Sequence, residues 1–162
     1  MEKKFRDSEV EVKKYRPMIA GVKHNPENIP EILNFLDEIN LTGKKVMLEI
    51  ASYPIQEKYV KSNKGFCEFF EAVAQRVMMG GGIILAGDSE ELIDRAAVEL
   101  NKLYLHSPSS YFCEYREIAS REREPYFLEF TKENKPDVII LDFGHADYVA
   151  SELGIGLHKV SV

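Results

Sequence analysis

Short apolar runs alternate along the chain with longer segments in which apolar residues recur every three or four positions. The short runs predict strands over 17–22, 45–50, 82–87 and 137–143, with a weaker strand over 155–162. A run that is apolar throughout, such as 82–87, is typical of a strand covered on both faces. The alternation therefore predicts an α/β fold, with a mostly parallel sheet of about five strands and helices on both faces. We expect one domain over 1–162.

Helical periodicity fills most of the segments between these strands. The predicted helices cover 29–39, 66–79, 89–104, 112–134 and 146–153. Asp88 and Glu91 have the spacing of a capping box at the start of the third helix. We expect the fourth helix to be broken or restarted at Pro125, because proline lacks the amide hydrogen that an interior turn needs. The segments 51–65 and 106–110 are predicted to be loops.

Four side chains that can bind ligands or move protons each follow a different predicted strand. They are His24, Glu49, Asp88 and His145. Ligands of open α/β sheets bind in the crevice outside the carboxyl ends of the strands, so we expect all four residues to face one crevice. Two imidazoles that meet there indicate either a metal site or an acid–base site.

Each of these residues also has a simpler interpretation when it is taken alone. His24 could be a structural histidine, His145 an exposed helix cap, and Asp88 the first residue of its capping box. Glu49 is more informative, because a carboxylate in an apolar strand is costly unless it is paired, liganded or at the strand's end. Together His24, His145 and Glu49 form a suitable set of ligands for a divalent metal such as Zn or Mn.

Alternating charges precede Pro125, in the sequence Ser120-Arg-Glu-Arg-Glu. The usual meaning of such a run is a solvated face, with Glu117 and Arg121 as a pair one turn apart. A helix break at Pro125 could instead aim Arg123 or Glu124 toward the interior.

Composition narrows the class of protein. A chain of 162 residues that is 44% hydrophobic can bury a continuous core, and its net charge of −6 comes from interspersed acidic and basic residues. This pattern argues against a nucleic-acid surface, and no apolar run approaches the roughly 20 residues that a membrane span needs. Cys67 and Cys113 form no disulfide framework, and both are expected in the core. We expect a cytoplasmic protein without nucleic-acid or membrane partners.

The order of four short motifs resembles that of one protein superfamily. The motifs are Gly21-Val-Lys-His24, Leu48-Glu49, Glu122-Arg-Glu-Pro-Tyr-Phe127 and Gly144-His145. They are similar to motifs of the superfamily that joins TraB/PrgY, Tiki, the erythromycin esterases and ChaN, over about residues 18–150. The resemblance implies an α/β core in which His24, Glu49, Arg123 and His145 line one site.

Tiki-like members of that superfamily are metal-dependent peptidases, the erythromycin esterases hydrolyse lactones, and TraB/PrgY members are linked to peptide-pheromone shutdown. This chain departs from the pattern at three positions. Glu124 replaces the usual Asp or Asn, Phe127 replaces Met, and Pro125 enters the helix. The chain is also shorter than typical members of the superfamily.

The sequence therefore predicts a hydrolase-like protein that acts on a peptide or on a small ester or lactone. In the metal-dependent version, His24 and His145, with or without Glu49, hold a Zn or Mn ion that lowers the pKa of a bound water. Glu49 could otherwise act as the general base, and Arg123 would stabilise an oxyanion or orient a substrate carboxylate. The alternative is a non-catalytic binding or interaction module that retains the fold. Either protein could form a homo-oligomer.

Specificity would lie in the loops 51–65 and 105–112. Aromatic side chains in these loops and next to them could pack against a ligand or cover the core. These side chains are Tyr53, Tyr59, Tyr104, Tyr111 and Phe112.

Overall fold

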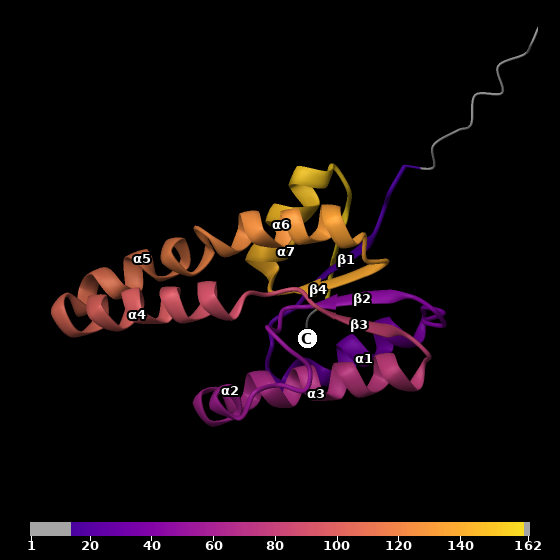
Figure 1. Cartoon of the computed structure of the whole chain (residues 1–162), viewed down its shortest axis with the longest axis horizontal. Coiled ribbons are helices and arrows are strands. Elements are labelled where there is room, and N and C mark those ends of the chain that lie inside the picture. Colours follow the sequence, from indigo (N-terminus) through magenta and orange to yellow (C-terminus); the bar gives the residue numbers. More distant parts are fainter. Residues whose placement is uncertain (1–13, 161–162) are drawn as a thin grey trace, which may run out of the picture.

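The computed structural model describes residues 14–160, in which a parallel sheet lies between two layers of helices (Figure 1). The sheet has five strands in the order β3-β2-β4-β1-β5. The strands are β1 (Met18–Gly21), β2 (Lys45–Leu48), β3 (Ile83–Ala86), β4 (Val138–Leu141) and β5 (Leu157–Lys159). The predicted α/β class and the parallel sheet are confirmed. The last two residues of the fifth predicted strand lie outside the described part of the chain.

A short 3-10 turn, η1 (Pro26–Asn28), leads into the first helix. The helices are α1 (Ile29–Asp37), α2 (Glu57–Ser62), α3 (Lys64–Met79), α4 (Glu90–His106), α5 (Pro108–Ser120), α6 (Arg123–Asn134) and α7 (Phe143–Leu153). None of the helices in the described chain combines the length and the apolar character that a membrane crossing requires.

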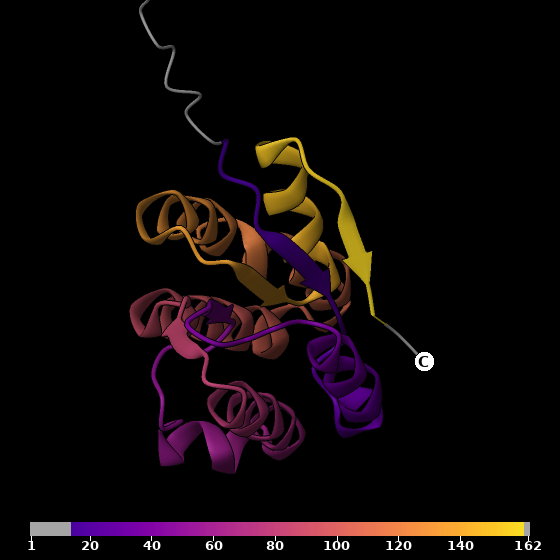
Figure 2. The ribbon, with the colours of Figure 1, turned by 90° about the vertical axis from the view of Figure 1, so that its right-hand side faces the viewer.

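Alternate residues of each strand supply two separate cores, because successive side chains in a strand point to opposite faces. Val46 and Leu48 pack with α1 and α3 on one face, whereas Met47 packs with α6 and α7 on the other. The same division holds along β4, where every residue is buried. Figure 2 shows the two helical layers on either side of the strands. The continuous apolar run of β4 reflects this covering of both faces. The run 82–87, for which the same covering was expected, forms the edge strand β3, and no residue of β3 is buried.

The connections between strands create a crevice at the carboxyl end of the sheet. The chain leaves β1 and β2 toward the face covered by α1 and α3, whereas it leaves β4 toward the face covered by α7. Strand β4 lies between β1 and β2, so helices diverge on opposite sides at this point. Ligands of open parallel sheets bind at such a reversal.

Two details of the helical prediction are wrong. Residues 106–110 are not a loop, because α4 runs to His106 and α5 starts at Pro108, where proline sacrifices no intrahelical hydrogen bond. The predicted loop 51–65 contains α2. The expected restart near Pro125 is present: the break lies at residues 121–122, and Pro125 falls in the first turn of α6, where amide hydrogens have no intrahelical partner.

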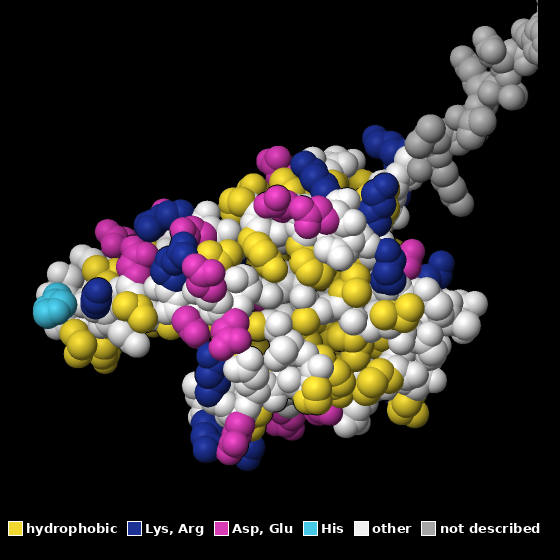
Figure 3. Space-filling view, in the orientation of Figure 1, with side chains coloured by type: hydrophobic (Ala, Val, Ile, Leu, Met, Phe, Trp, Pro, Cys, Tyr) yellow, Lys and Arg dark blue, Asp and Glu magenta, His cyan; other side chains and the backbone are white. Residues whose placement is uncertain are grey.

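Helices α4 and α5 form a hairpin that projects beyond the sheet (Figure 1). No residue of α4, all of which the structure describes, is buried, and Ile118 is the buried residue of α5. Interspersed acidic and basic side chains cover the side of the hairpin seen in Figure 3. Cys113 is exposed on α5, so its predicted place in the core is wrong, whereas Cys67 is buried as expected.

Candidate functional site

The predicted rim residues meet at the carboxyl end of the sheet. His24 follows β1, Glu49 follows β2 directly, and His145 lies in the first turn of α7, after β4. His24 Nε2 is 3.7 Å from Glu49 Oε2, and His145 Nε2 is 3.6 Å from Glu49 Oε1. The expectation that two histidines more than a hundred residues apart face one crevice is therefore confirmed, with Glu49 between them.

Hydrogen bonds from two different elements hold the carboxylate of Glu49. Oε1 accepts a bond of 2.9 Å from Arg123 Nη2, and Oε2 accepts a bond of 2.8 Å from the backbone N–H of Asp142. The Glu49 side chain is only 5% exposed. These partners offset the cost of burying a carboxylate at the end of an apolar strand.

Arg123 joins Glu49 to a second buried carboxylate, that of Asp88. Its Nη2 lies 2.5 Å from Asp88 Oδ2, and its Nε donates to Asp88 Oδ1 over 3.3 Å. The capping role predicted for Asp88 is wrong, because Ser89 is the N-cap of α4 and its hydroxyl accepts from the N–H of Leu92. Asp88 instead forms the ion pair with Arg123 and accepts a hydrogen bond from the N–H of Ser89.

Burial and charge act in opposite directions on these groups. Burial by itself raises the pKa of Glu49, but His24, His145, Arg123 and the N–H of Asp142 outweigh it and lower that pKa below its usual range. Burial raises the pKa of Asp88 and exceeds the opposing effect of Arg123. Burial by itself lowers the pKa of the Arg123 guanidinium, but Asp88 and Glu49 raise it overall.

His24 lies in an aromatic environment. Its ring packs against Phe66, Phe69 and Phe70, with centroid separations of 5.6, 5.2 and 4.5 Å. Burial lowers its pKa, and the negative charges of Glu49 and Asp142 act in the opposite direction. The imidazole is therefore neutral at neutral pH. Its Nε2 is buried and has no hydrogen-bond partner among the described residues.

His145 is held by α6. Its Nδ1 lies 3.1 Å from Glu124 Oε1, and its ring packs on Phe127 at a centroid separation of 5.2 Å. Both Arg123 and Glu124 face inward, whereas Arg121 pairs with Glu117 on the surface, as the sequence predicted. The sequence alone assigned no partner to Glu124. The expected helix break was the one indication that Glu124 faces the site, because the first turn of a helix can direct consecutive side chains into the same site.

A large cleft opens above these charged groups, with a volume of about 1160 Å³. Its floor carries His24, Glu49, Asp88, Arg123 and His145, and α4 forms one wall. Figure 3 shows the concave outline beneath the hairpin. Five aromatic residues were expected either to contact a ligand or to cover the core. Tyr59 lines this cleft, Tyr53 packs against the core, and Tyr104, Tyr111 and Phe112 pack together on the hairpin.

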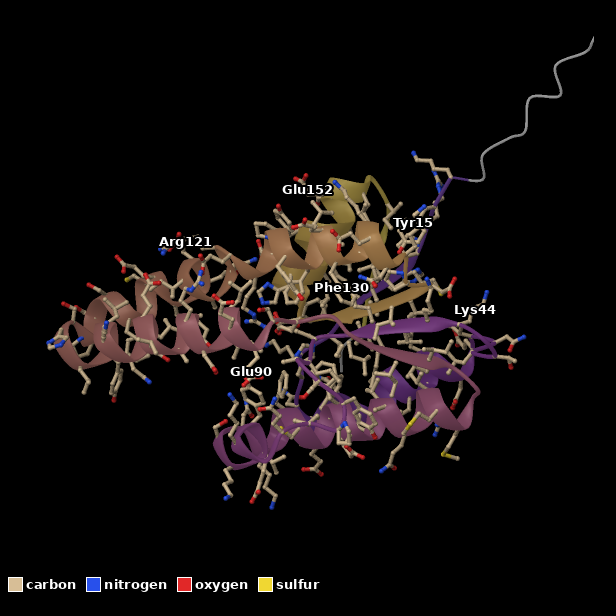
Figure 4. The ribbon with its side chains drawn as sticks, in the orientation of Figure 1. Tyr15, Lys44, Glu90, Arg121, Phe130 and Glu152 are labelled. Carbon is tan, nitrogen blue, oxygen red and sulfur yellow. The ribbon has the colours of Figure 1, made fainter. Side chains whose placement is uncertain are left out.

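Polar bonds join the first two turns of α4 to Gln56 and to α2. Lys58 Nζ lies 2.6 Å from Glu90 Oε1 and 3.2 Å from Asp94 Oδ2, and Gln56 donates to Glu90 over 2.9 Å. Figure 4 shows Glu90 at the α2 side of the hairpin and Arg121 on its outer side. These bonds connect the wall formed by α4 to the segment that follows Glu49.

The predicted metal ligands do not fit a metal site as they are arranged here. Within residues 14–160, no three His, Cys, Asp or Glu side chains form a group that could hold a metal ion. Both oxygens of Glu49 already accept hydrogen bonds, from Arg123 and from the N–H of Asp142. This arrangement does not favour the predicted metal binding by His24, His145 and Glu49, which metal analysis can test.

The site thus consists of two imidazoles, a central carboxylate, and an arginine that the fold itself neutralises. The resemblance to the TraB/PrgY, Tiki, erythromycin esterase and ChaN superfamily stays a hypothesis based on four short motifs. Comparison of the chain with known protein families, curated proteins and solved structures gives no match.

Proposed function

We propose that this protein is a hydrolase of small carboxylic esters or lactones, with His145 as the general base. One observation carries the proposal. His145 is bonded through Nδ1 to Glu124, while its Nε2 faces Glu49 across 3.6 Å on the floor of the cleft. A base whose second nitrogen is oriented by a carboxylate is a recurrent arrangement for activating a nucleophile.

The bond to Glu124 selects the useful form of the imidazole. A carboxylate accepts a hydrogen bond, so Nδ1 carries the proton and Nε2 keeps its lone pair. A water beside Nε2 would give its proton to His145 as its oxygen bonds to the carbonyl carbon of the substrate. The carbon–oxygen bond of the ester then breaks, and the proton passes from His145 to the leaving alkoxide. The products are an acid and an alcohol.

The other residues support this proton transfer. Glu49 is a poor general base, because its pKa is lowered and both its oxygens are hydrogen-bonded. Its negative charge beside Nε2 instead stabilises the imidazolium that forms on His145. Arg123 Nη1 takes no part in the bonds to Glu49 and Asp88. That nitrogen, together with the neutral His24, would stabilise the oxyanion of the tetrahedral intermediate.

The size of the cleft favours a small substrate. A volume of about 1160 Å³ is close to that of pockets that bind drug-sized ligands. The apolar wall and the charged floor fit a molecule with a nonpolar body and one polar reacting group. These features support an ester or lactone over the peptide that the sequence also allowed.

The test measures hydrolysis of p-nitrophenyl esters of different chain length and of a set of lactones. We expect H145A to lower kcat/KM by about 10²–10⁴, the usual contribution of a general base. H106A is the matched control, because His106 lies at the exposed end of α4, away from the cleft. Turnover in H145A equal to that of the wild type would contradict this assignment.

A non-catalytic binding module is the second candidate. It is favoured by the ion pairs of Arg123 with Glu49 and Asp88, because these carboxylates already balance the charge that would stabilise an oxyanion. A wild-type protein that hydrolyses none of these compounds, yet binds their product acids in the cleft, would support the binding module and reject the hydrolase.

A further inference from the structure

We infer that the cleft selects ligands with an apolar body and an anionic group, carboxylate or phosphate, and that Arg116 binds this group. The inference rests on the proposed function only in naming the substrate class of the same site. Arg116 belongs to α5 and lines the cleft beside Gly144 and His145. It is a different arginine from Arg123, whose Nε and Nη2 are bonded to Asp88 and Glu49.

Arg116 lies against the first turn of α7. A Cβ added to Gly144 would lie 2.9 Å from Arg116 Nη2, 3.4 Å from Cζ and 3.5 Å from Nε. The missing side chain of Gly144 therefore makes room for the guanidinium next to the catalytic histidine. The amino-terminal end of a helix carries partial positive charge, so a cation placed there gains nothing from α7. An anion bound between them would be stabilised by both.

Arg116 has no ion-pair or hydrogen-bond partner among the described residues. Its neighbours on the hairpin are paired elsewhere, since Glu117 and Glu99 both bind Arg121. Asp142 and Asp147 line the same cleft, but neither forms an ion pair with Arg116. Lys23 and Lys159 add two further cations to the lining. The guanidinium thus presents donors to the cleft that no described residue uses.

An independent observation indicates that the cleft is built for a ligand. The His24 side chain is only 7% exposed, and its Nε2 is unpartnered among the described residues although the residue lines the cleft. A buried polar atom without a partner costs stability, and a polar ligand atom would satisfy it.

The apolar part of the ligand is defined by the wall of the hairpin. Ile93, Ala96, Ala97 and Leu100 recur at helical spacing on α4 and line the cleft. Tyr115 and Ala119 flank Arg116 on the same wall, from α5. Ile55 and Phe66 contribute from the other side. An arginine set into an apolar wall suits a ligand whose anionic group is joined to a hydrocarbon or aromatic body.

The first experiment measures binding without catalysis, by NMR titration of the full chain with hexanoate, hexyl phosphate and hexanamide. Hexanoate and hexanamide have similar shapes and differ in charge. We expect both anions to shift the backbone amide of Gly144 and hexanoate to bind more tightly than hexanamide. The relative affinity for the two anions shows which group is preferred.

The variants R116Q and R116K assign the effect to Arg116. We expect R116Q to lower the ratio of hexanoate to hexanamide affinity by about tenfold, and R116K to lower it less, because lysine keeps the charge and loses the bidentate geometry. R16Q is the matched control. Arg16 is also exposed, and it lies before the amino end of β1, whereas the cleft lies at the carboxyl ends of the strands. Arg116 is exposed and unpaired, so folding of R116Q should be normal.

The second experiment compares p-nitrophenyl hexanoate with the p-nitrophenyl monoester of adipic acid. We expect the wild type to prefer the carboxylated ester and R116Q to lose that preference. Equal affinity of the wild type for hexanoate and hexanamide, no binding of either anion, or an unchanged ratio in R116Q would overturn the inference. Arg116-dependent anion binding without ester turnover would reject the hydrolase only, whereas turnover of neutral esters without any anion preference would reject the ligand class only.

Discussion

Replacing Arg123 by methionine should destabilise the protein strongly, and more at high pH than at low pH. The guanidinium is the cation between two buried carboxylates, whose side chains are 5% exposed in Glu49 and 1% exposed in Asp88. Methionine preserves the apolar contacts of the arginine stem but leaves both carboxylates without their shared partner.

The magnitude follows from the bonds that are lost. Arg123 makes three hydrogen bonds to the two carboxylates, and a bond to a charged group contributes about 1.5–3 kcal/mol. Their simple sum overestimates the effect, because bonds that share one side chain are not additive. Removing one partner of a buried ion pair typically costs about 3–5 kcal/mol, so we expect about 4 kcal/mol for R123M.

The pH dependence has a definite sign. Without the guanidinium, the folded-state pKa of both carboxyls rises, and that of Asp88, which burial already raises, moves further above its value in the unfolded chain. A carboxyl with a raised folded-state pKa favours the folded state at low pH, and this contribution is lost as pH rises through that pKa. The cost of R123M should therefore be larger at about pH 8 than at about pH 5.

Urea unfolding at both pH values measures the effect. R121M is the control, because Arg121 is exposed and its ion pairs lie on the surface, where water and salt weaken them. The double variant D88N/R123M should recover part of the loss, since it removes one of the two stranded charges. An R123M variant as stable as R121M, or one that loses more stability at low pH, would refute the role of Arg123 as the neutralising cation.

The remaining predictions concern other parts of the site and the fold. The folded-state pKa of His24 is lowered, so as pH falls the unfolded chain takes up a proton on this histidine at a higher pH than the folded protein does. The free energy of unfolding should therefore decrease below about pH 6.5, and thermal unfolding of H24Q should show a smaller decrease. Gly21→Ala should lower the free energy of unfolding by about 1–3 kcal/mol, because the added Cβ would lie 2.9 Å from Phe143. Gly156→Ala is the control: its Cβ would have no atom within 4 Å, so the loss in the same unfolding assay should be less than about 1 kcal/mol. E124A should shift the ¹⁵N resonances of His145 away from the Nδ1–H tautomer, and unchanged resonances would remove Glu124 from the mechanism. Metal analysis of protein purified without chelators should find no Zn or Mn bound through these residues, and a metal content that falls in the double variant H24A/H145A would reverse that expectation.

The general position of the site was predictable from the sequence. Strand runs and their alternation with helices require a parallel sheet, and residues after parallel strands necessarily reach one edge. This reasoning found His24, Glu49 and His145 without any information about side-chain packing. Glu49 stood out because an isolated carboxylate in an apolar strand needs a partner.

The partners themselves were not predictable, because they depend on where individual helices begin. Asp88 has good capping-box spacing, but Arg123 competes for its carboxylate and leaves the cap to Ser89. The bond between Glu124 and His145 depends on α6 starting at Arg123, two residues before the proline that suggested a break. Tertiary contacts decide such cases, and a single sequence does not contain them.

In the proposed hydrolase, the hairpin of α4 and α5 separates recognition from chemistry. The residues proposed to move protons are fixed by the strand ends and by α6 and α7. Ile93, Leu100 and Arg116 instead come from the long crossover between β3 and β4. Because no residue of α4 is buried, substitutions along it disturb the core little. The ligand preference of this protein could therefore diverge during evolution by changes in the hairpin alone, with the reacting groups and the sheet kept constant.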